Sequence, residues 1–362
     1  MQSSSPLRLR RRPALAGIRP ALLLALSLLL PGRGFAQSPL GVPSHLLDRA
    51  TAGNQRDQLQ LAFAYLHSAA PEGSEQALHW FSVAADRGDP QAQTALGMMY
   101  QQGLGTSRDF DRAAQWYRRA AAEGYAPAQA RLASLYYSGR GVARDDAEAF
   151  RLMRRAADQD YAEAQTDLGI LYLLGRGVPR DEVTAIRWFR KGVAHDPGSA
   201  FALGVCYEHG YGVARDPQAA IRWYRRAADQ DYGPAENNLG ILYESGSGVD
   251  ASVEQALAWY RRAAGHGIPA SYLNLGRVYG AGPQAVRDRH AAFMWYTAAR
   301  RVGMLDSPSQ ARLESQLSLL PPAERQQVET EAMAWLAQHP LADEAWGPAS
   351  SQLSASRGPD QR

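Results

Sequence analysis

The sequence predicts an all-α fold, a solenoid of seven helix-turn-helix repeats that ends in C-terminal capping helices. Three observations in the 362 residues predict it. A Leu-(Gly/Ala)-x-x-Tyr unit recurs at steps of 35 or 36 residues, an aromatic pair follows about 20 residues later in six of the seven cases, and glycine-rich turns separate the two. A fixed period of this length is typical of stacked helical repeats, because one helix pair cannot bury its own apolar face.

The Leu-(Gly/Ala)-x-x-Tyr unit predicts the first helix of each repeat. Leucine and tyrosine four residues apart lie on one helix face, and the small residue beside them lets a neighbouring helix approach closely. In five repeats a Gly-x-Gly turn follows, such as Gly103 and Gly105. Its first glycine is expected to end the helix in the left-handed conformation. The seven units begin at Leu61, Leu96, Leu132, Leu168, Leu203, Leu239 and Leu275.

The aromatic pair predicts the second helix. It is Trp-Phe or Trp-Tyr in six repeats, as in Trp116-Tyr117, and Leu152-Met153 in the third. Ala-Ala usually follows, which sets small side chains beside large ones. Each second helix is expected to begin after a residue whose side-chain oxygen can accept a free backbone N–H, thirteen positions after the leucine. These expected caps are Ser74, Asp109, Asp145, Asp181, Asp216, Ser252 and Asp288.

In this combination of motifs the chain resembles the Sel-one-like repeat (SLR) family, which is similar to the tetratricopeptide repeats. The resemblance rests on LG-x-x-Y, G-x-G-V, the capping aspartate, W-Y and A-A within one period, and it covers residues 57–306. It implies a right-handed superhelix that binds other proteins, and an exported bacterial member of the family. The first repeat departs from the pattern at Ser68, and the last at Gly280 to Pro283 and at Arg300. Terminal repeats of an array are often irregular in this way.

Both ends of the chain lie outside the repeats. Residues 1–36 have the pattern of a signal peptide, with arginines, an apolar run from Ala21 to Leu30, and small residues before a cleavage site after Ala36. The run is shorter than the roughly 20 residues that span a bilayer, so we expect cleavage, a periplasmic or secreted location and no transmembrane segment in the mature protein. A retained N-terminal anchor is the alternative. Residues 37–56 are a lead-in, 307–340 are expected to form capping helices, and 341–362 a disordered tail.

Charge and residue chemistry argue against several classes of function. The formal net charge is +3, but residues 1–36 hold six arginines and no acid, so 33 basic and 36 acidic residues remain. This near-neutral body gives no electrostatic support to nucleic-acid binding. Cys206 is the single cysteine, and the eight histidines are scattered without metal-ligand spacing. We therefore expect no catalytic residues, no metal and no cofactor.

The candidate partner-binding residues lie on the first helices. By analogy with tetratricopeptide repeats, these helices line the concave face, and the positions two before, two after and five after each leucine point into the groove. An apolar centre rimmed by polar groups is typical of a site for a peptide or a partner helix. A second interpretation, equally open, places several of these residues in the core. The candidates are Met98, Gln101, Tyr137, Ile170, Leu173, Phe201, Val205, Glu208, Ile241, Glu244 and Arg277.

The function expected from these features is a protein–protein interaction scaffold of the cell envelope. One alternative is an envelope hydrolase of β-lactamase-like type, as described for cysteine-rich exported members of the SLR family, although a single cysteine departs from their paired cysteines. Another is a binder of an anionic exopolysaccharide, which would use the basic pairs on successive second helices, from Arg118-Arg119 to Arg261-Arg262. A solvated outer face is the competing interpretation of these pairs.

Overall fold

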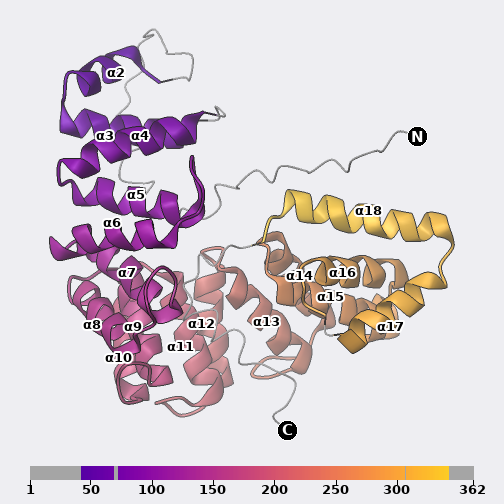
Figure 1. Ribbon diagram of the computed structural model, residues 1–362. Helices are drawn as coiled ribbons and strands as arrows, with labels where there is room; N and C mark the ends of the chain where they lie inside the picture. The colour runs from indigo at the N-terminus through magenta and orange to yellow at the C-terminus, as the bar shows by residue number, and fades with distance from the viewer. Residues whose placement is uncertain (1–41, 69–71, 306, 342–362) are drawn as a thin grey trace, which may run out of the picture.

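The computed structural model describes residues 42–68, 72–305 and 307–341, which form seventeen α-helices and one short 3-10 helix, Gln284–Val286. The predicted signal peptide, the start of the lead-in and the predicted tail beyond Leu341 lie outside these residues. In the described part of the chain, no helix is both long and apolar enough to cross a membrane. Figure 1 shows the helices stacked side by side along a curved path, which confirms the all-α solenoid.

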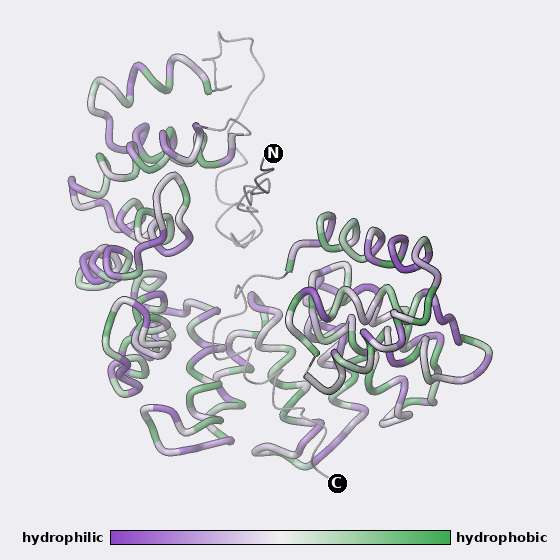
Figure 2. The backbone as a smooth tube through the Cα atoms, turned by 45° about the vertical axis from the view of Figure 1, so that its right-hand side comes forward, coloured by the Kyte–Doolittle hydropathy of each residue, from purple (hydrophilic) through white to green (hydrophobic). Residues whose placement is uncertain are grey.

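Each repeat is a pair of helices, a first (A) helix and a second (B) helix, that pack closely against each other. In Figure 2 green and purple alternate along the helices, as expected where one face is buried and the other is not. The A helices of repeats 1 to 7 are α3 (Gln55–Leu66), α5 (Pro90–Gln102), α7 (Ala126–Ser138), α9 (Ala162–Leu174), α11 (Pro197–His209), α13 (Gly233–Ser245) and α15 (Pro269–Ala281). The B helices are α4 (Gly73–Asp86), α6 (Phe110–Ala122), α8 (Asp146–Ala157), α10 (Glu182–Gly192), α12 (Pro217–Ala228), α14 (Val253–Gly265) and α16 (Arg289–Arg301).

Three further helices cover the two ends of the stack. Helix α2 (Ser44–Thr51) packs against α3 through buried Leu46 and Ala50, a helix that the sequence analysis did not predict within the lead-in. At the other end, α17 (Ser307–Ser318) and α18 (Pro322–Gln338) are the two predicted capping helices. Helix α18 lies on α16. The terminal repeats therefore do not present a bare apolar face to solvent.

The Gly-x-Gly turns both end the A helices and join neighbouring repeats. The first glycine of each turn takes a positive φ, from 67° at Gly175 to 79° at Gly210, as predicted. The second glycine lies against the first turn of the preceding B helix. A Cβ atom at Gly141, for example, would lie 2.2 Å from the backbone oxygen of Phe110, a distance that no side chain can occupy.

Six of the seven predicted helix caps are confirmed, and Ser74 is not. Helix α4 begins at Gly73, so Ser74 lies inside its first turn, and the N-cap residue Glu72 makes no side-chain capping bond. Repeat 1 has Ser68 in place of a turn glycine, and Gly73 packs so closely on it that a Cβ would lie 2.2 Å from the Ser68 Oγ. The helix therefore starts two residues earlier than predicted, with Glu72 in place of Ser74 at the N-cap position. The caps whose side chains accept a backbone N–H are Asp109, Asp145, Asp181, Asp216, Ser252 and Asp288.

The small residue of the Leu-Gly pair lets the two helices of a repeat approach closely, as predicted. In repeats 2, 4, 5, 6 and 7 this glycine lies against the second aromatic ring of its own B helix. A Cβ at Gly240 would lie 2.4 Å from the ring of Tyr260, which is fully buried. Glycine and ring therefore fit together as hole and knob.

The A helices lie on the inner side of the curve. Helix α5 contacts α7, and α9 contacts α11, past the B helix that separates them in sequence. Across the described chain these contacts are more extensive than those between successive B helices. Neighbouring helices converge on the inside of a curved stack, so the concave face is formed by A helices. Figure 1 shows the resulting arch, with α2–α6 and α13–α18 as two arms joined through α7–α12.

Candidate functional site

Five of the predicted groove residues belong to the core, and their assignment to a partner-binding surface is corrected. Ile170, Leu173, Phe201 and Val205 are 0–4% exposed, and Tyr137 is 8% exposed. For the four residues of α9 and α11, the reason is that these two A helices contact each other at the centre of the arch. Tyr137, on α7, packs instead in a cluster with Ala149 and Met153 of α8.

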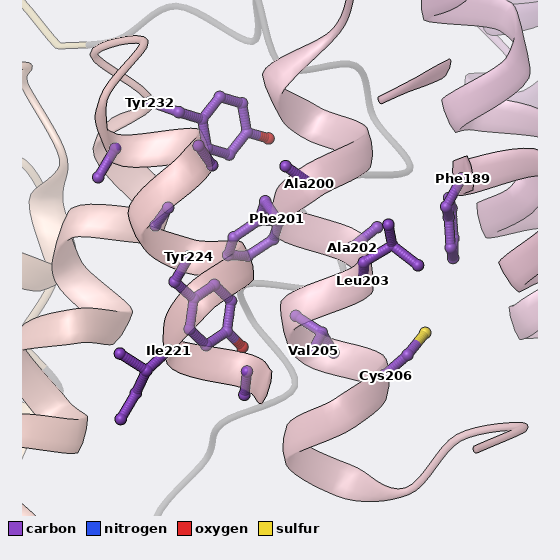
Figure 3. Packing of buried hydrophobic residues seen from close by; sticks show 14 of the residues in the cluster. Phe189, Ala200, Phe201, Ala202, Leu203, Val205, Cys206, Ile221, Tyr224 and Tyr232 are labelled. Carbon is purple, nitrogen blue, oxygen red and sulfur yellow. The ribbon is translucent and has the colours of Figure 1, made fainter. Parts of the chain in front are cut away.

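Phe201 shows how closely the centre is packed. Its ring lies between Tyr224 and Tyr232, with ring centroids 5.7 and 5.4 Å away (Figure 3). All three rings are at most 1% exposed. The sequence also allowed the interpretation that several candidate residues belong to the core, and this interpretation applies to the middle repeats.

Three polar candidates accept hydrogen bonds inside their own repeats. Gln101 accepts the hydroxyl of Tyr117 at 2.9 Å, and Glu208 accepts that of Tyr224 at 2.7 Å. Glu244 accepts the hydroxyl of Tyr260 at 2.8 Å. Where the B helix offers Met153 or Phe189 instead, without a hydroxyl, the A helix has Tyr137 or Leu173 at the matching position. The chemistry of these A-helix residues thus complements the B-helix residue that each of them contacts in its own repeat.

Replacing Tyr224 with phenylalanine tests this matching. The change removes the hydroxyl and leaves the Glu208 carboxylate without that donor, so we expect a loss of about 1–2 kcal/mol in the free energy of unfolding. Urea unfolding followed by circular dichroism measures it. The double variant Tyr224→Phe/Glu208→Leu copies the Phe189/Leu173 pair of repeat 4 and should recover much of the loss. A neutral single variant would contradict the assignment.

The C-terminal part of the concave face carries an ion pair. Arg277 is exposed and donates to both carboxylate oxygens of Glu244, at 2.5 and 2.6 Å. Burial alone would raise the pKa of Glu244, but hydrogen bonds from Arg277 and Tyr260 outweigh it and hold that pKa below its ordinary value. Ile241, in the same region, is half-buried. The charges here neutralise each other and leave little net field for a partner.

The N-terminal part of the concave face contains an apolar hollow. It has an empty volume of about 590 Å³, part of it open to solvent, and lies among the A helices of repeats 1 to 3. Of the predicted site residues only Met98, which is half-buried, lines it. The full lining is Phe63, Leu66, His67, Gln91, Thr94, Ala95, Met98, Met99, Gln102, Leu104, Tyr125 and Pro127.

The polar groups of the hollow suit an uncharged ligand segment. Among its described lining residues there is no aspartate, glutamate, lysine or arginine. His67 and Thr94 are bonded to backbone carbonyls of their own helix. The amides of Gln91 and Gln102, both half-buried, form no hydrogen bond within the described chain. Two amides beside an apolar surface can bond a peptide backbone while the hollow takes a side chain.

The basic pairs on the B helices pack on aromatic rings. Arg119 lies 4.4 Å from the ring centroid of Trp116 on its own helix. Arg225 lies 5.9 Å from the ring of Tyr243, which belongs to the next repeat. Such cation–π contacts join successive repeats. The exposed side chains therefore have a structural role, and an anionic partner stays a prediction.

The reactive groups of the core are inaccessible. Burial raises the pKa of the Cys206 thiol to about 12, and the charge of Glu182 adds to this. Thr166 donates to Asp196 at 2.6 Å and lies 2.5 Å from the Ser199 hydroxyl, but all three side chains are at most 3% exposed. This network joins α9 to the start of α11 and offers no surface for a substrate.

One cluster in the described chain offers possible metal ligands. Asp231, Glu236 and His266 place ligand atoms within 4.8 Å of one another. The Arg262 guanidinium, however, lies 2.9 Å from Glu236 Oε1, so the protein itself supplies a cation at the buried carboxylate. The cluster is better explained as an ionic junction between helices.

Sequence reasoning missed most of the hollow. Phe63 stands two residues after Leu61, the position that Met98 occupies in the next repeat, yet it is not among the predicted site residues. Gln91 and Gln102 lie near the two ends of α5 and carry no repeat signal. Only the spacing of three A helices shows that these residues surround one space.

Comparison with known proteins adds independent findings. Seven consecutive segments match the family model described as Sel1 repeat: residues 55–89, 90–125, 126–161, 162–196, 197–232, 233–268 and 269–303. The chain is similar to a solved Sel1 repeat protein from Oxalobacter formigenes, with 28% identity over 68% of this chain and 96% of that chain and a TM-score of 0.60. It is also similar to c5321, a protective antigen of uropathogenic Escherichia coli strains with an SLR fold, with 27% identity over 87% of this chain and 79% of that chain and a TM-score of 0.51. None of the curated proteins matches this chain.

Proposed function

The chain belongs to the Sel1 repeat family, whose members generally serve as protein–protein interaction scaffolds, and we propose that this member binds its protein partner in the apolar hollow of repeats 1 to 3. The observation that carries the proposal is the accessible apolar lining around Met98. In the centre of the concave face Ile170 and Phe201 are buried, and toward the C-terminus Arg277 pairs with Glu244. A stack of helices with an apolar recess is suited to hold a peptide segment.

The chemistry of the hollow indicates what the partner presents. Its lining favours one large apolar side chain, such as leucine, methionine or phenylalanine, because the flexible side chain of half-buried Met98 adapts to such groups. Charged residues next to that anchor would lose hydration without gaining a partner. The amides of Gln91 and Gln102 are placed to bond the backbone on either side. The proposed ligand is an uncharged, apolar segment of an envelope protein.

We propose in addition that the protein works in the periplasm or is secreted. The support is the pattern of residues 1–36, in which arginines precede a ten-residue apolar run and small residues precede Gln37. A partner would accordingly be a protein of the cell envelope.

Neither alternative function has an observation in its favour that outweighs the hollow. A hydrolase needs an accessible nucleophile, whereas Cys206 and Ser199 are buried. Binding of an anionic polysaccharide would have to compete with the aromatic contacts of the basic pairs, as at Arg119 and Arg225. We therefore place the protein partner first.

The substitution Met98→Asp tests the site. A carboxylate in the hollow would have to be desolvated by the apolar anchor, so we expect binding of the partner to weaken at least about 30-fold. Crosslinking of the native protein in intact cells, followed by purification and mass spectrometry of the envelope fraction, identifies the partner. Calorimetry with the partner segment then measures the dissociation constant.

The chain offers a matched control for this experiment. Met333 on α18 is 49% exposed and lies outside the hollow, so Met333→Asp introduces the same charge and should leave binding unchanged. Both variants must unfold at the same temperature as the parent chain. Unchanged affinity in folded Met98→Asp would reject the hollow as the site, and recovery of the native protein in the cytoplasmic fraction would reject the location.

A further inference from the structure

A glutamine clasp closes four junctions in the N-terminal part of the stack. Three residues before the repeat leucine, repeats 1 to 4 have a buried glutamine whose amide donates to the last turn of the preceding helix. Gln93, for example, donates to the backbone oxygen of Ala85 at 3.1 Å. The same bond joins Gln58 to Ala50, Gln129 to Ala121 and Gln165 to Ala157. The clasp is uncharged and does not titrate.

The junction between repeats 5 and 6 replaces this clasp with ionised groups. Glu236 occupies the glutamine position, is fully buried, and has no N–H to donate. The equivalent carbonyl, that of Ala228, accepts a hydrogen bond from Arg262 at 3.1 Å instead. Arg262 also pairs with Glu236 at 2.9 Å, and His266 Nδ1 lies 2.7 Å from the other oxygen of Glu236. The junction between repeats 5 and 6 thus depends on charged side chains of α13, of the end of α14 and of the turn before α13.

The charges of this cluster balance only when His266 is protonated. Two acids, Asp231 and Glu236, then face two cations, Arg262 and His266. Loss of the imidazole proton leaves one excess negative charge beside a buried carboxylate, where compensation by solvent is weakest. Arg262 alone then holds both Glu236 and the Ala228 carbonyl.

We propose that Asp231, Glu236, Arg262 and His266 form a pH-responsive hinge between repeats 5 and 6, which is firm when His266 is protonated and looser when it is neutral. The junction connects α7–α12, the central part of the arch, with the arm α13–α18 (Figure 1), while the apolar hollow lies among α3, α5 and α7. Loosening it changes how the two arms sit relative to each other. The proposal is independent of the identity of any partner.

The direction of the effect follows from the histidine. The hydrogen bond to Glu236 raises the pKa of His266 above its ordinary 6.5, and the charges of Glu236 and Asp231 add to this, against burial and the charge of Arg262. A group with a raised pKa in the folded state stabilises that state fully below its unfolded pKa. The contribution of His266 is therefore complete below about pH 6.5 and is lost as the pH rises through its folded pKa.

Hydrogen exchange of the full chain tests the hinge, with its own glutamine junctions as internal controls. The measured quantity is the protection of backbone amides over 230–236 relative to 87–93, at about pH 5.5 and about pH 8.5, after correction for intrinsic rates. We expect protection of 230–236 to fall about three- to tenfold at the higher pH relative to 87–93. An unchanged ratio between the two segments would overturn the proposal.

The substitution Glu236→Gln supplies the decisive variant, because it restores the residue that the chain uses at four other junctions. Its amide should bond the Ala228 carbonyl as Gln93 bonds that of Ala85, and the pH response of 230–236 should disappear. His266→Gln, which leaves Glu236 in place, should give the loosened state at both pH values. Persistence of the full pH response in both variants would show that it arises elsewhere.

Discussion

Phe201→Ala is expected to destabilise the protein by about 3–5 kcal/mol, the usual cost of truncating a buried aromatic side chain. The ring is 1% exposed and fills the space between Tyr224 and Tyr232. It lies in repeat 5, in the part of the arch that joins the two arms, so the cavity also weakens the coupling between them. Urea unfolding followed by far-ultraviolet circular dichroism should show a lower midpoint, and splitting of the transition into two would indicate uncoupled arms.

Leu319→Ala provides the control for this truncation. Leu319 is 78% exposed, so its loss should change stability by no more than about 0.5 kcal/mol. Equal effects of the two substitutions would contradict the placement of Phe201 in the core. A folded Phe201→Ala protein with normal stability would restore the interpretation of Phe201 as a surface residue of the groove.

Gly240→Ala is expected to have the second large effect, a loss of roughly 2 kcal/mol. One added methyl group would lie 2.4 Å from the buried ring of Tyr260, which cannot move without disturbing its bond to Glu244. Overpacking of this kind costs about 3 kcal/mol, and the better helix propensity of alanine offsets about 1 kcal/mol. The unfolding free energy of the variant measures the net result.

Gly265→Ala is the matched control in the same repeat. This glycine also lies in a helix, but a Cβ there would meet nothing within 4 Å. Alanine should therefore leave stability unchanged or raise it by up to about 1 kcal/mol. If both glycine variants were stabilised, the close packing of glycine on the tyrosine ring would be refuted.

These results bear on how binding should be tested. Substitutions at Phe201 or Leu173 would lower partner binding by unfolding the centre, whatever surface the partner uses. Met98 separates the two effects, because it is half-buried at the rim of the hollow. Contact with a partner stays a prediction for Gln101, Glu208, Ile241, Glu244 and Arg277. Substitution of Gln101, Glu208 or Glu244 also removes a hydrogen bond from a buried tyrosine, so the stability of each such variant must be measured beside its binding.

The repeat could be predicted from the amino-acid sequence, because every feature of one repeat is local. The spacing of Leu168 and Tyr172 sets a helix face, the left-handed glycine at Gly175 ends that helix, and the side chain of Asp181 starts the next one. Each depends on interactions within a few residues, and the period shows where they recur. The helix pairs, the turns and six of seven caps could therefore be predicted.

Which residues of a repeat are exposed could not be predicted in this way, because exposure depends on how the repeats pack against one another. Equivalent positions at Met98, Ile170 and Arg277 are half-buried, buried and exposed, although they occupy the same place in the sequence pattern. Exposure there depends on the distance between successive A helices, which the curvature of the whole stack sets. The hollow is likewise formed only by three repeats together, and the hinge of Asp231, Glu236, Arg262 and His266 only by two. The curvature of the stack results from small differences in helix packing at many contacts between repeats. A short stretch of sequence does not contain enough information to predict it.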